Sequence, residues 1–181
     1  MKVADESTAV RQDSPTWSPD GNWLAFVSTR PGGLVLAKAH ASADSPAIDL
    51  SSVAMSFVRW SPRGDWILCV TNEGLGLISP DGKAKRDLRQ GAPLTFGWSK
   101  DGDRVYGVDN RNRRLVLFSI HARGGGEETI TDLGPAPLDP APYLYFGSVR
   151  GFSMAPDGKT FAASILRPKS DIWLLEGFRA P

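Results

Sequence analysis

A serine nucleophile is the first chemistry that the sequence could support. Residues 151–155, Gly-Phe-Ser-Met-Ala, come close to the Gly-x-Ser-x-Gly phrase of serine hydrolases but lack its last glycine. That phrase works at a strand-to-helix turn, whereas these residues fall where a first strand of the repeat described below is expected. The two histidines, His40 and His121, are expected in loops after third strands, on the outer side of the molecule. We therefore predict no Ser-His-Asp triad and no catalytic activity.

Metal binding would need His, Cys or carboxylate groups that converge on one point. One cysteine, Cys69, and two distant histidines do not make a zinc site. Four aspartates recur in similar phrases and could suggest calcium: Asp20, Asp81, Asp101 and Asp157. Aspartate in a turn commonly accepts hydrogen bonds from nearby backbone N–H groups, and we favour that interpretation. We predict no metal, no cofactor, and an inert core thiol at Cys69.

A basic pattern is the remaining candidate for binding. The position thirteen residues after the start of each repeated phrase holds Arg30, Glu73, Arg111 and Arg167 in turn. These positions are expected on one rim, between second and third strands. Further basic residues follow nearby: Arg113, Arg114 and Lys169. The pattern predicts a partly basic rim that docks an acidic peptide or carboxylate ligand; the alternative is a set of solvated turn residues that the repeat carries in any case.

Four copies of one short phrase divide the chain. Three begin with tryptophan, at Trp17, Trp60 and Trp98, and a drifted fourth begins at Met154. The first two intervals, about 43 and 38 residues, match the period of a four-stranded propeller blade. Each phrase favours a type I turn ending on a left-handed glycine, which joins two antiparallel strands. The turn residues are Pro19, Asp20, Gly21, Gly64, Asp101, Gly102, Pro156, Asp157 and Gly158.

Short apolar segments follow each phrase and predict strands. The expected second strands are residues 23–27, 66–70, 105–108 and 161–163. The expected third strands are residues 34–36, 75–78, 115–118 and 172–175. Fourth strands end in Asp-Leu at 49–50, 87–88 and 132–133. No segment keeps a 3.6-residue apolar period over ten residues, so almost no helix is expected.

The predicted fold is all-β, a β-propeller of four-stranded antiparallel blades, with about four blades in an incomplete ring. Residues 1–181 form one partial propeller domain. Its repeats are placed at about 12–50, 51–88, 89–133 and 145–178, with an insertion loop at 134–148. The leading tryptophans are expected to pack blades together rather than to line a ligand cage. Because such burial is worth about 3–5 kcal/mol, we expect Trp17→Ala to unfold a blade.

Composition narrows the classes of partner. The chain is 41% hydrophobic and 23% charged, which is typical of a soluble globular protein. Its formal net charge is +1, so there is no general attraction to nucleic acid or to a membrane surface. No apolar run approaches the length of a membrane span. Residues 1–11 contain no apolar core of a signal peptide.

The Trp-Ser-Pro-Asp-Gly phrase followed by an apolar strand resembles the TolB-type WD40-like (PD40) repeat over residues 12–178. The resemblance implies a non-catalytic propeller module that mediates protein–protein or ligand binding in the periplasm or another extracytoplasmic compartment. The last segment, 151–178, is also similar to the final blade of bacterial sensor proteins. In those proteins a propeller follows a Ser/Thr kinase or winged-helix domain, which gives an alternative role as a sensor propeller fragment. A propeller detached from a serine peptidase is a further alternative.

The chain departs from that family in its number of blades. TolB-like propellers usually have six or more blades, and the fourth repeat here ends after its third strand. We therefore expect the C-terminal part of a longer propeller; a self-closing ring of four blades is the alternative. An open fan leaves a blade face and sheet edges uncovered, which favours self-association besides binding of a protein or peptide partner.

Overall fold

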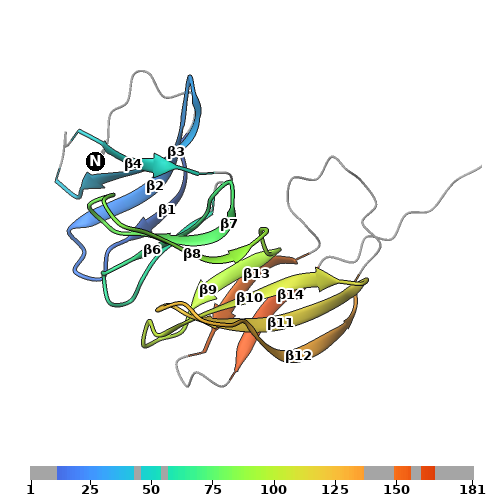
Figure 1. Cartoon of the computed structure of the whole chain (residues 1–181). Helices are drawn as coiled ribbons and strands as arrows, with labels where there is room; N and C mark the ends of the chain where they lie inside the picture. The colour runs from blue at the N-terminus through green and yellow to red at the C-terminus, as the bar shows by residue number, and fades with distance from the viewer. Residues whose placement is uncertain (1–11, 43–45, 54–56, 137–148, 156–159, 166–181) are drawn as a thin grey trace, which may run out of the picture.

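The computed structural model describes residues 12–42, 46–53, 57–136, 149–155 and 160–165 (Figure 1). Every regular element within these residues is a β-strand, and the strands form separate antiparallel sheets. The prediction of an all-β fold almost without helix is confirmed for this part of the chain. No helix that could cross a membrane is found in the same residues.

Three sheets have four strands each, in the order of the chain, and we call them blades 1 to 3. Blade 1 contains β1 (Gln12–Trp17), β2 (Trp23–Arg30), β3 (Gly33–His40) and β4 (Ile48–Ser52). Blade 2 contains β5 (Val58–Trp60), β6 (Ile67–Val70), β7 (Gly74–Ile78) and β8 (Lys85–Gln90). Blade 3 contains β9 (Thr95–Trp98), β10 (Arg104–Arg111), β11 (Arg114–His121) and β12 (Glu128–Pro135).

A fourth sheet contains β13 (Val149–Met154) paired with β14 (Phe161–Ile165), and we call it blade 4. These two strands take the places of a first and a second strand. The third strand expected at 172–175 and most of the insertion loop, 137–148, lie outside the described residues.

The repeated phrase forms the turn that its residues favour. The backbone N–H of Gly21 donates to the Ser18 carbonyl at 2.9 Å, and the same bond recurs from Gly102 to Ser99 at 3.0 Å. Both glycines have left-handed backbones, with φ of 71° and 70°. Because a side chain disfavours that conformation, glycine closes the turn and the chain enters the second strand. The residues Ser-Pro-Asp-Gly also occur at 79–82, and they form the same turn between β7 and β8, where the Gly82 N–H donates to the Ser79 carbonyl at 2.8 Å.

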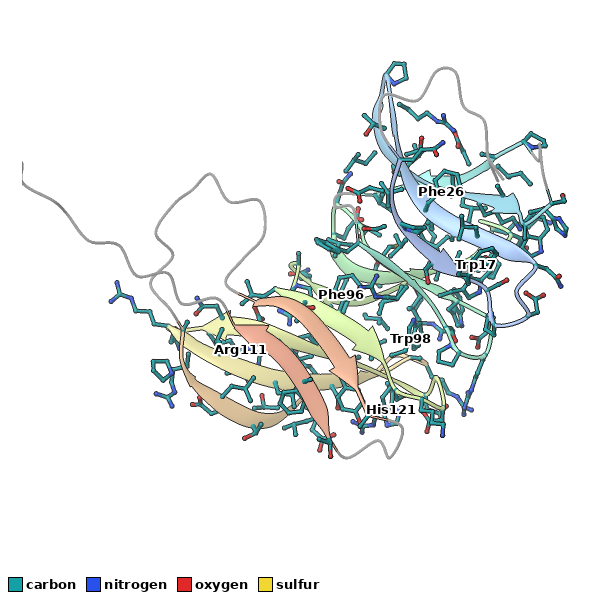
Figure 2. The ribbon with its side chains drawn as sticks, turned by 180° about the vertical axis from the view of Figure 1, so that it is seen from behind. Trp17, Phe26, Phe96, Trp98, Arg111 and His121 are labelled. Carbon is teal, nitrogen blue, oxygen red and sulfur yellow. The ribbon has the colours of Figure 1, made fainter. Side chains whose placement is uncertain are left out.

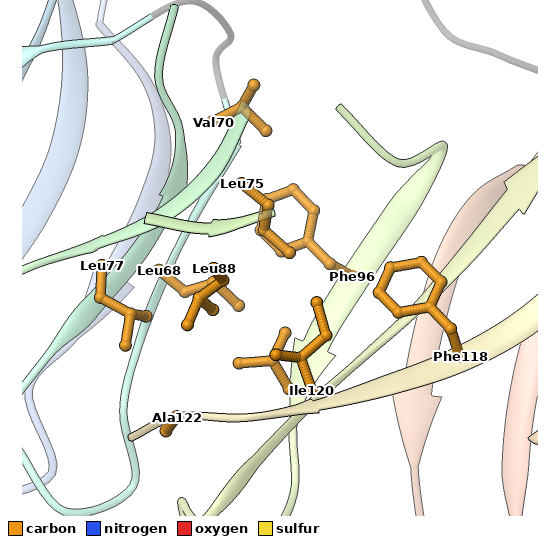
Figure 3. Packing of buried hydrophobic residues seen from close by; sticks show 10 residues of the cluster. Leu68, Val70, Leu75, Leu77, Leu88, Phe96, Phe118, Ile120 and Ala122 are labelled. Carbon is orange, nitrogen blue, oxygen red and sulfur yellow. The ribbon is translucent and has the colours of Figure 1, made fainter. Parts of the chain in front are cut away.

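Apolar residues lie on both faces of the blades, and neighbouring blades pack these faces together. We call the face toward the preceding blade the leading face and the opposite one the trailing face. Ala25, Val27 and Leu36 on the trailing face of blade 1 pack with Trp60 and Ile67 on the leading face of blade 2. A larger cluster joins blades 2 and 3 in the same way (Figure 3). Its members are Leu68, Val70, Leu75, Leu77, Leu88, Phe96, Val105, Phe118, Ile120 and Ala122.

The leading tryptophans do not share one environment. Trp60 is 8% exposed within the cluster between blades 1 and 2, and Trp98 packs against the cluster between blades 2 and 3. Trp17 is 55% exposed, so the expectation that it packs two blades together is wrong. It pairs with Leu24 on the leading face of blade 1, which has no preceding blade among the described residues. Because Trp17 is largely in solvent, there is no longer a physical reason to expect that Trp17→Ala unfolds a blade.

The histidines are also placed differently from the expectation. His40 is the last residue of β3 and His121 the last of β11, so both belong to third strands rather than to the loops after them. Each pairs across the sheet with the first residue of a second strand, Trp23 or Arg104. The strands therefore extend further toward this end of the blades than the apolar runs indicate.

Candidate functional site

The turns between second and third strands lie together at one end of the blades. In antiparallel sheets of one strand order, these turns lie opposite the turns that carry the repeated phrase. Arg30 ends β2 and Arg111 ends β10, while Glu73 lies in the turn before β7. Figure 2 shows Arg111 at the end of blade 3 away from His121. We call this end the hairpin rim.

Two of the predicted rim arginines are held by carboxylates of their own blades. Arg30 Nη2 lies 2.8 Å from Asp49 Oδ1, and the Arg30 side chain is 18% exposed. Arg111 pairs with Glu127, and its Nε lies 3.6 Å from Asp109 Oδ2. Its guanidinium also lies over the Phe118 ring, 5.6 Å from the centroid. Both side chains thus fold back onto their own sheets, where each is already paired with a carboxylate.

A further arginine, which the sequence analysis did not find, completes this cluster. Arg89 of β8 places Nη2 2.8 Å from Asp109 Oδ2 and Nη1 3.1 Å from Glu127 Oε2. Its guanidinium lies 4.7 Å from the Phe118 centroid, close to that of Arg111. Two cations and two carboxylates balance each other here, and they join the outer strand of blade 2 to blade 3. The sequence indicated Arg111 through its position in the repeat. It did not indicate the acidic partners of Arg111, because they lie in segments without a repeated motif.

The tip of the β10–β11 hairpin presents the remaining cation of the rim. Asn112 and Arg113 have φ of 50° and 63°, the pattern of a two-residue type I′ turn. The Arg113 side chain is exposed, and no carboxylate of the described residues pairs with it. The neighbouring Arg114 pairs with Asp132. Arg167 and Lys169, the other predicted rim residues, lie outside the described residues.

The aspartates of the repeated turns are occupied by donors of their own loops. Ser99 Oγ donates to Asp101 Oδ1 at 2.6 Å, and the backbone N–H of Asp103 donates to the same oxygen at 3.0 Å. The hydroxyl and then the N–H lower the pKa of Asp101 below 3.8. Asp20 and Asp81 have the same arrangement and lowered pKa values. This geometry supports the turn-capping interpretation over calcium; Asp157 lies outside the described residues, which contain no cluster of metal-ligating side chains.

The other reactive side chains have structural surroundings. Cys69 is buried between blades 1 and 2, and burial raises the pKa of its thiol to about 12. Ser153 lies within strand β13, as expected, and not at a strand-to-helix turn. His40 packs edge-on against Trp23 and places Nδ1 2.9 Å from Ser42 Oγ. His121 Nε2 lies 3.2 Å from Arg104 Nη2 at the end of blade 3.

No protein-family model and no curated protein matches the chain. Among solved structures, a protein assigned as a TolB, from Agrobacterium tumefaciens, is similar with TM-score 0.60 and 19% identity, over 71% of this chain and 52% of that one. TolB from Acinetobacter baumannii is similar with TM-score 0.58 and 15% identity, over 87% of this chain and 43% of the other. Oligogalacturonate lyase from Vibrio parahaemolyticus is similar with TM-score 0.56 and 14% identity, over 86% of this chain and 51% of the other.

The chain thus spans about half the length of the solved structures it matches. At these identities the likeness concerns the fold and not the activity, since one fold carries many functions. The predicted fold class is confirmed, because the chain builds the four-stranded antiparallel blades of a β-propeller, as in these TolB structures.

Proposed function

We propose that this chain is a non-catalytic, TolB-like propeller module of the WD40 (PD40) type that binds a protein or peptide partner. The fold likeness to TolB structures and the repeated turn phrase support this proposal. The structural surroundings of Cys69, His40 and His121 support binding over catalysis, because each is engaged in packing or in local hydrogen bonds. By the same likeness we propose a periplasmic setting.

The observation that carries the proposal is the exposed arginine at the tip of the β10–β11 hairpin. Arg113 stands on a two-residue turn whose backbone is fixed by the paired strands on both sides. The backbone N–H of Ala136 also donates to the Arg113 carbonyl at 2.8 Å, which ties the tip to the end of β12. A cation on a preorganised turn loses little conformational entropy when it binds.

The chemistry of the tip selects the partner. Guanidinium groups form two parallel hydrogen bonds with a carboxylate. Arg30, Arg89 and Arg111 already have carboxylate partners, so Arg113 is the rim arginine of the described residues that can accept one without breaking a pair. An acidic peptide, with carboxylates at the spacing of an extended chain, is the ligand class that this tip fits.

Binding of a fluorescein-labelled oligoglutamate peptide, measured by fluorescence anisotropy, tests the proposal. Arg113→Glu should weaken binding about fivefold, since an exposed ion pair is worth up to about 1 kcal/mol. Added salt should weaken binding by the wild-type chain, because exposed charges are screened.

Arg123→Glu is the matched control. Arg123 is an exposed arginine of the same blade, in the loop that follows β11 at the opposite end. It should bind the peptide as the wild type does. If both variants lose the same affinity, the peptide is responding to net charge alone and the hairpin rim is not the site.

A further inference from the structure

The blade 2 turn of the hairpin rim carries an exposed carboxylate. Glu73 has the position in its repeat that Arg30 and Arg111 have in blades 1 and 3. Its side chain is exposed, and no cation of the described residues pairs with it. The rim therefore presents an unpaired negative charge on blade 2 and an unpaired positive charge, that of Arg113, on the next blade.

The backbone that carries this carboxylate is fixed by close contacts. The backbone N–H of Glu73 donates to Thr71 Oγ1 at 3.3 Å, and the same hydroxyl lies 3.3 Å from Glu73 Oε2. The Glu73 carbonyl accepts the backbone N–H of Gly91 at 3.3 Å, which ties the turn to the end of β8. A Cβ on Gly74 would lie only 2.3 Å from the Arg89 carbonyl, so the turn packs directly against that strand.

The charge cluster around Arg89 joins this turn to the hairpin of blade 3. Arg89 Nη2 lies 2.8 Å from Asp109 Oδ2, and its Nη1 lies 3.1 Å from Glu127 Oε2. Asp109 belongs to β10, the strand that leads to the tip with Arg113. Because the cations and carboxylates of the cluster balance, the cluster connects the two exposed charges of the rim and adds no net charge of its own.

We propose that Glu73 is a specificity-determining residue of the hairpin rim, which selects a peptide that carries lysine or arginine beside its carboxylates. This inference rests on the proposed binding of an acidic peptide at Arg113. A peptide that lies across blades 2 and 3 with a cation at Glu73 and a carboxylate at Arg113 forms two ion pairs. A uniformly acidic peptide forms one pair and is repelled at Glu73. Repulsion of the wrong ligand contributes to specificity as much as attraction of the right one does.

Fluorescence anisotropy with two fluorescein-labelled peptides of equal length tests the proposal. One is oligoglutamate, and the other joins a lysine block and a glutamate block through a flexible Gly-Ser linker. The wild type should bind the lysine–glutamate peptide more tightly. Glu73→Gln keeps the size of the side chain and removes its charge. It should weaken binding of the lysine–glutamate peptide by up to about fivefold, the effect of one exposed ion pair, and should strengthen binding of oligoglutamate.

Asp87→Asn is the matched control, since Asp87 is an exposed carboxylate of the same blade, on β8. This variant should keep the wild-type ratio of the two dissociation constants. A ratio that Glu73→Gln leaves unchanged, an equal change in Asp87→Asn, or tighter binding of oligoglutamate by the wild type would each overturn the proposal.

Arg113→Glu separates failure of this proposal from failure of the proposed function. If Arg113→Glu weakens binding of both peptides while Glu73→Gln leaves the ratio unchanged, the proposed function stands and the role of Glu73 is wrong. If Arg113→Glu weakens binding of neither peptide, the proposed function fails, and the role of Glu73 fails with it.

Discussion

At the scale of the residue, the repeated turn shows why a recurring aspartate need not be a ligand. The Asp101 carboxylate accepts hydrogen bonds from the Ser99 hydroxyl and from the backbone N–H of Asp103, and both bonds favour its ionised form. Ser99 Oγ also accepts the backbone N–H of Arg104 at 2.9 Å. One serine thereby links the carboxylate to the start of the next strand. The Asp101 carboxylate thus stabilises the conformation of the loop.

Replacing Ser99 by alanine tests this assignment. Because the Ser99 hydroxyl is the largest cause of the lowered pKa of Asp101, Ser99→Ala should raise that pKa toward 3.8, while the Asp103 N–H keeps it below. A carboxylate with a lowered folded pKa stabilises the fold above 3.8 and loses this contribution as the pH falls through the folded pKa. The variant should therefore show less of this acid-dependent loss of stability.

Carbon-13 NMR titration of the carboxyl groups measures the shift directly. Ser51→Ala, at a serine of β4 that does not contact this turn, should leave the pKa of Asp101 as it is in the wild type. Added calcium should not change the titration. A calcium-dependent shift at Asp101 would instead favour the ligand interpretation that the turn geometry disfavours.

At the scale of the element, one glycine shows how the sheet makes room for its neighbour. Gly107 lies in the middle of β10, where glycine is normally unfavourable. A Cβ there would lie 2.4 Å from Cζ of Phe118 and 3.1 Å from the Thr95 carbonyl. The Phe118 ring, fully buried between blades 2 and 3, occupies the space that a side chain would need. The large side chain of Phe118 thus fills the space that the absence of a side chain at Gly107 leaves.

We expect Gly107→Ala to lower the free energy of unfolding by about 1–3 kcal/mol, the usual cost of overpacking a core. Urea denaturation followed by circular dichroism measures the change. Gly32→Ala is the matched control, because no atom lies within 4 Å of its Cβ position and its backbone is not left-handed. That variant should be as stable as the wild type or slightly more so. Equal losses in the two variants would show that the Phe118 ring moves aside without cost.

The elements themselves were largely predictable, since their signals are local. Turn glycines and apolar runs placed β2, β6, β7, β10 and β11 and the turns between them. The cluster of Arg89 with Asp109 and Glu127 was not predictable, because its members come from three segments and meet only after the blades stack. The exposure of Trp17 has the same origin. Its five-residue phrase differs from that of Trp60 only in having Asp20 where the second repeat has Arg63, so the phrase does not reveal which tryptophan is exposed.

At the scale of the whole molecule, stability is expected to depend on how many faces of a blade are covered. In repeat proteins, each unit gains stability mainly from its contacts with neighbours. Blade 2 has clusters on both faces, and every residue of β6 and β7 is buried. Blade 1 has an apolar cluster with blade 2 on its trailing face, while Trp17 on its leading face is 55% exposed. The blades should therefore open with different free energies.

Hydrogen exchange of the wild-type chain followed by mass spectrometry tests this difference. Peptides from 67–78, which contain β6 and β7, should exchange more slowly than peptides from 24–39 in β2 and β3. The comparison is matched, because all four strands are central in their sheets and bonded on both sides. Local opening then reports the coverage of the blade faces and not the strand ladder. Equal rates for the two pairs of strands would mean that the blades unfold as one unit, and that stacking is cooperative along the described chain.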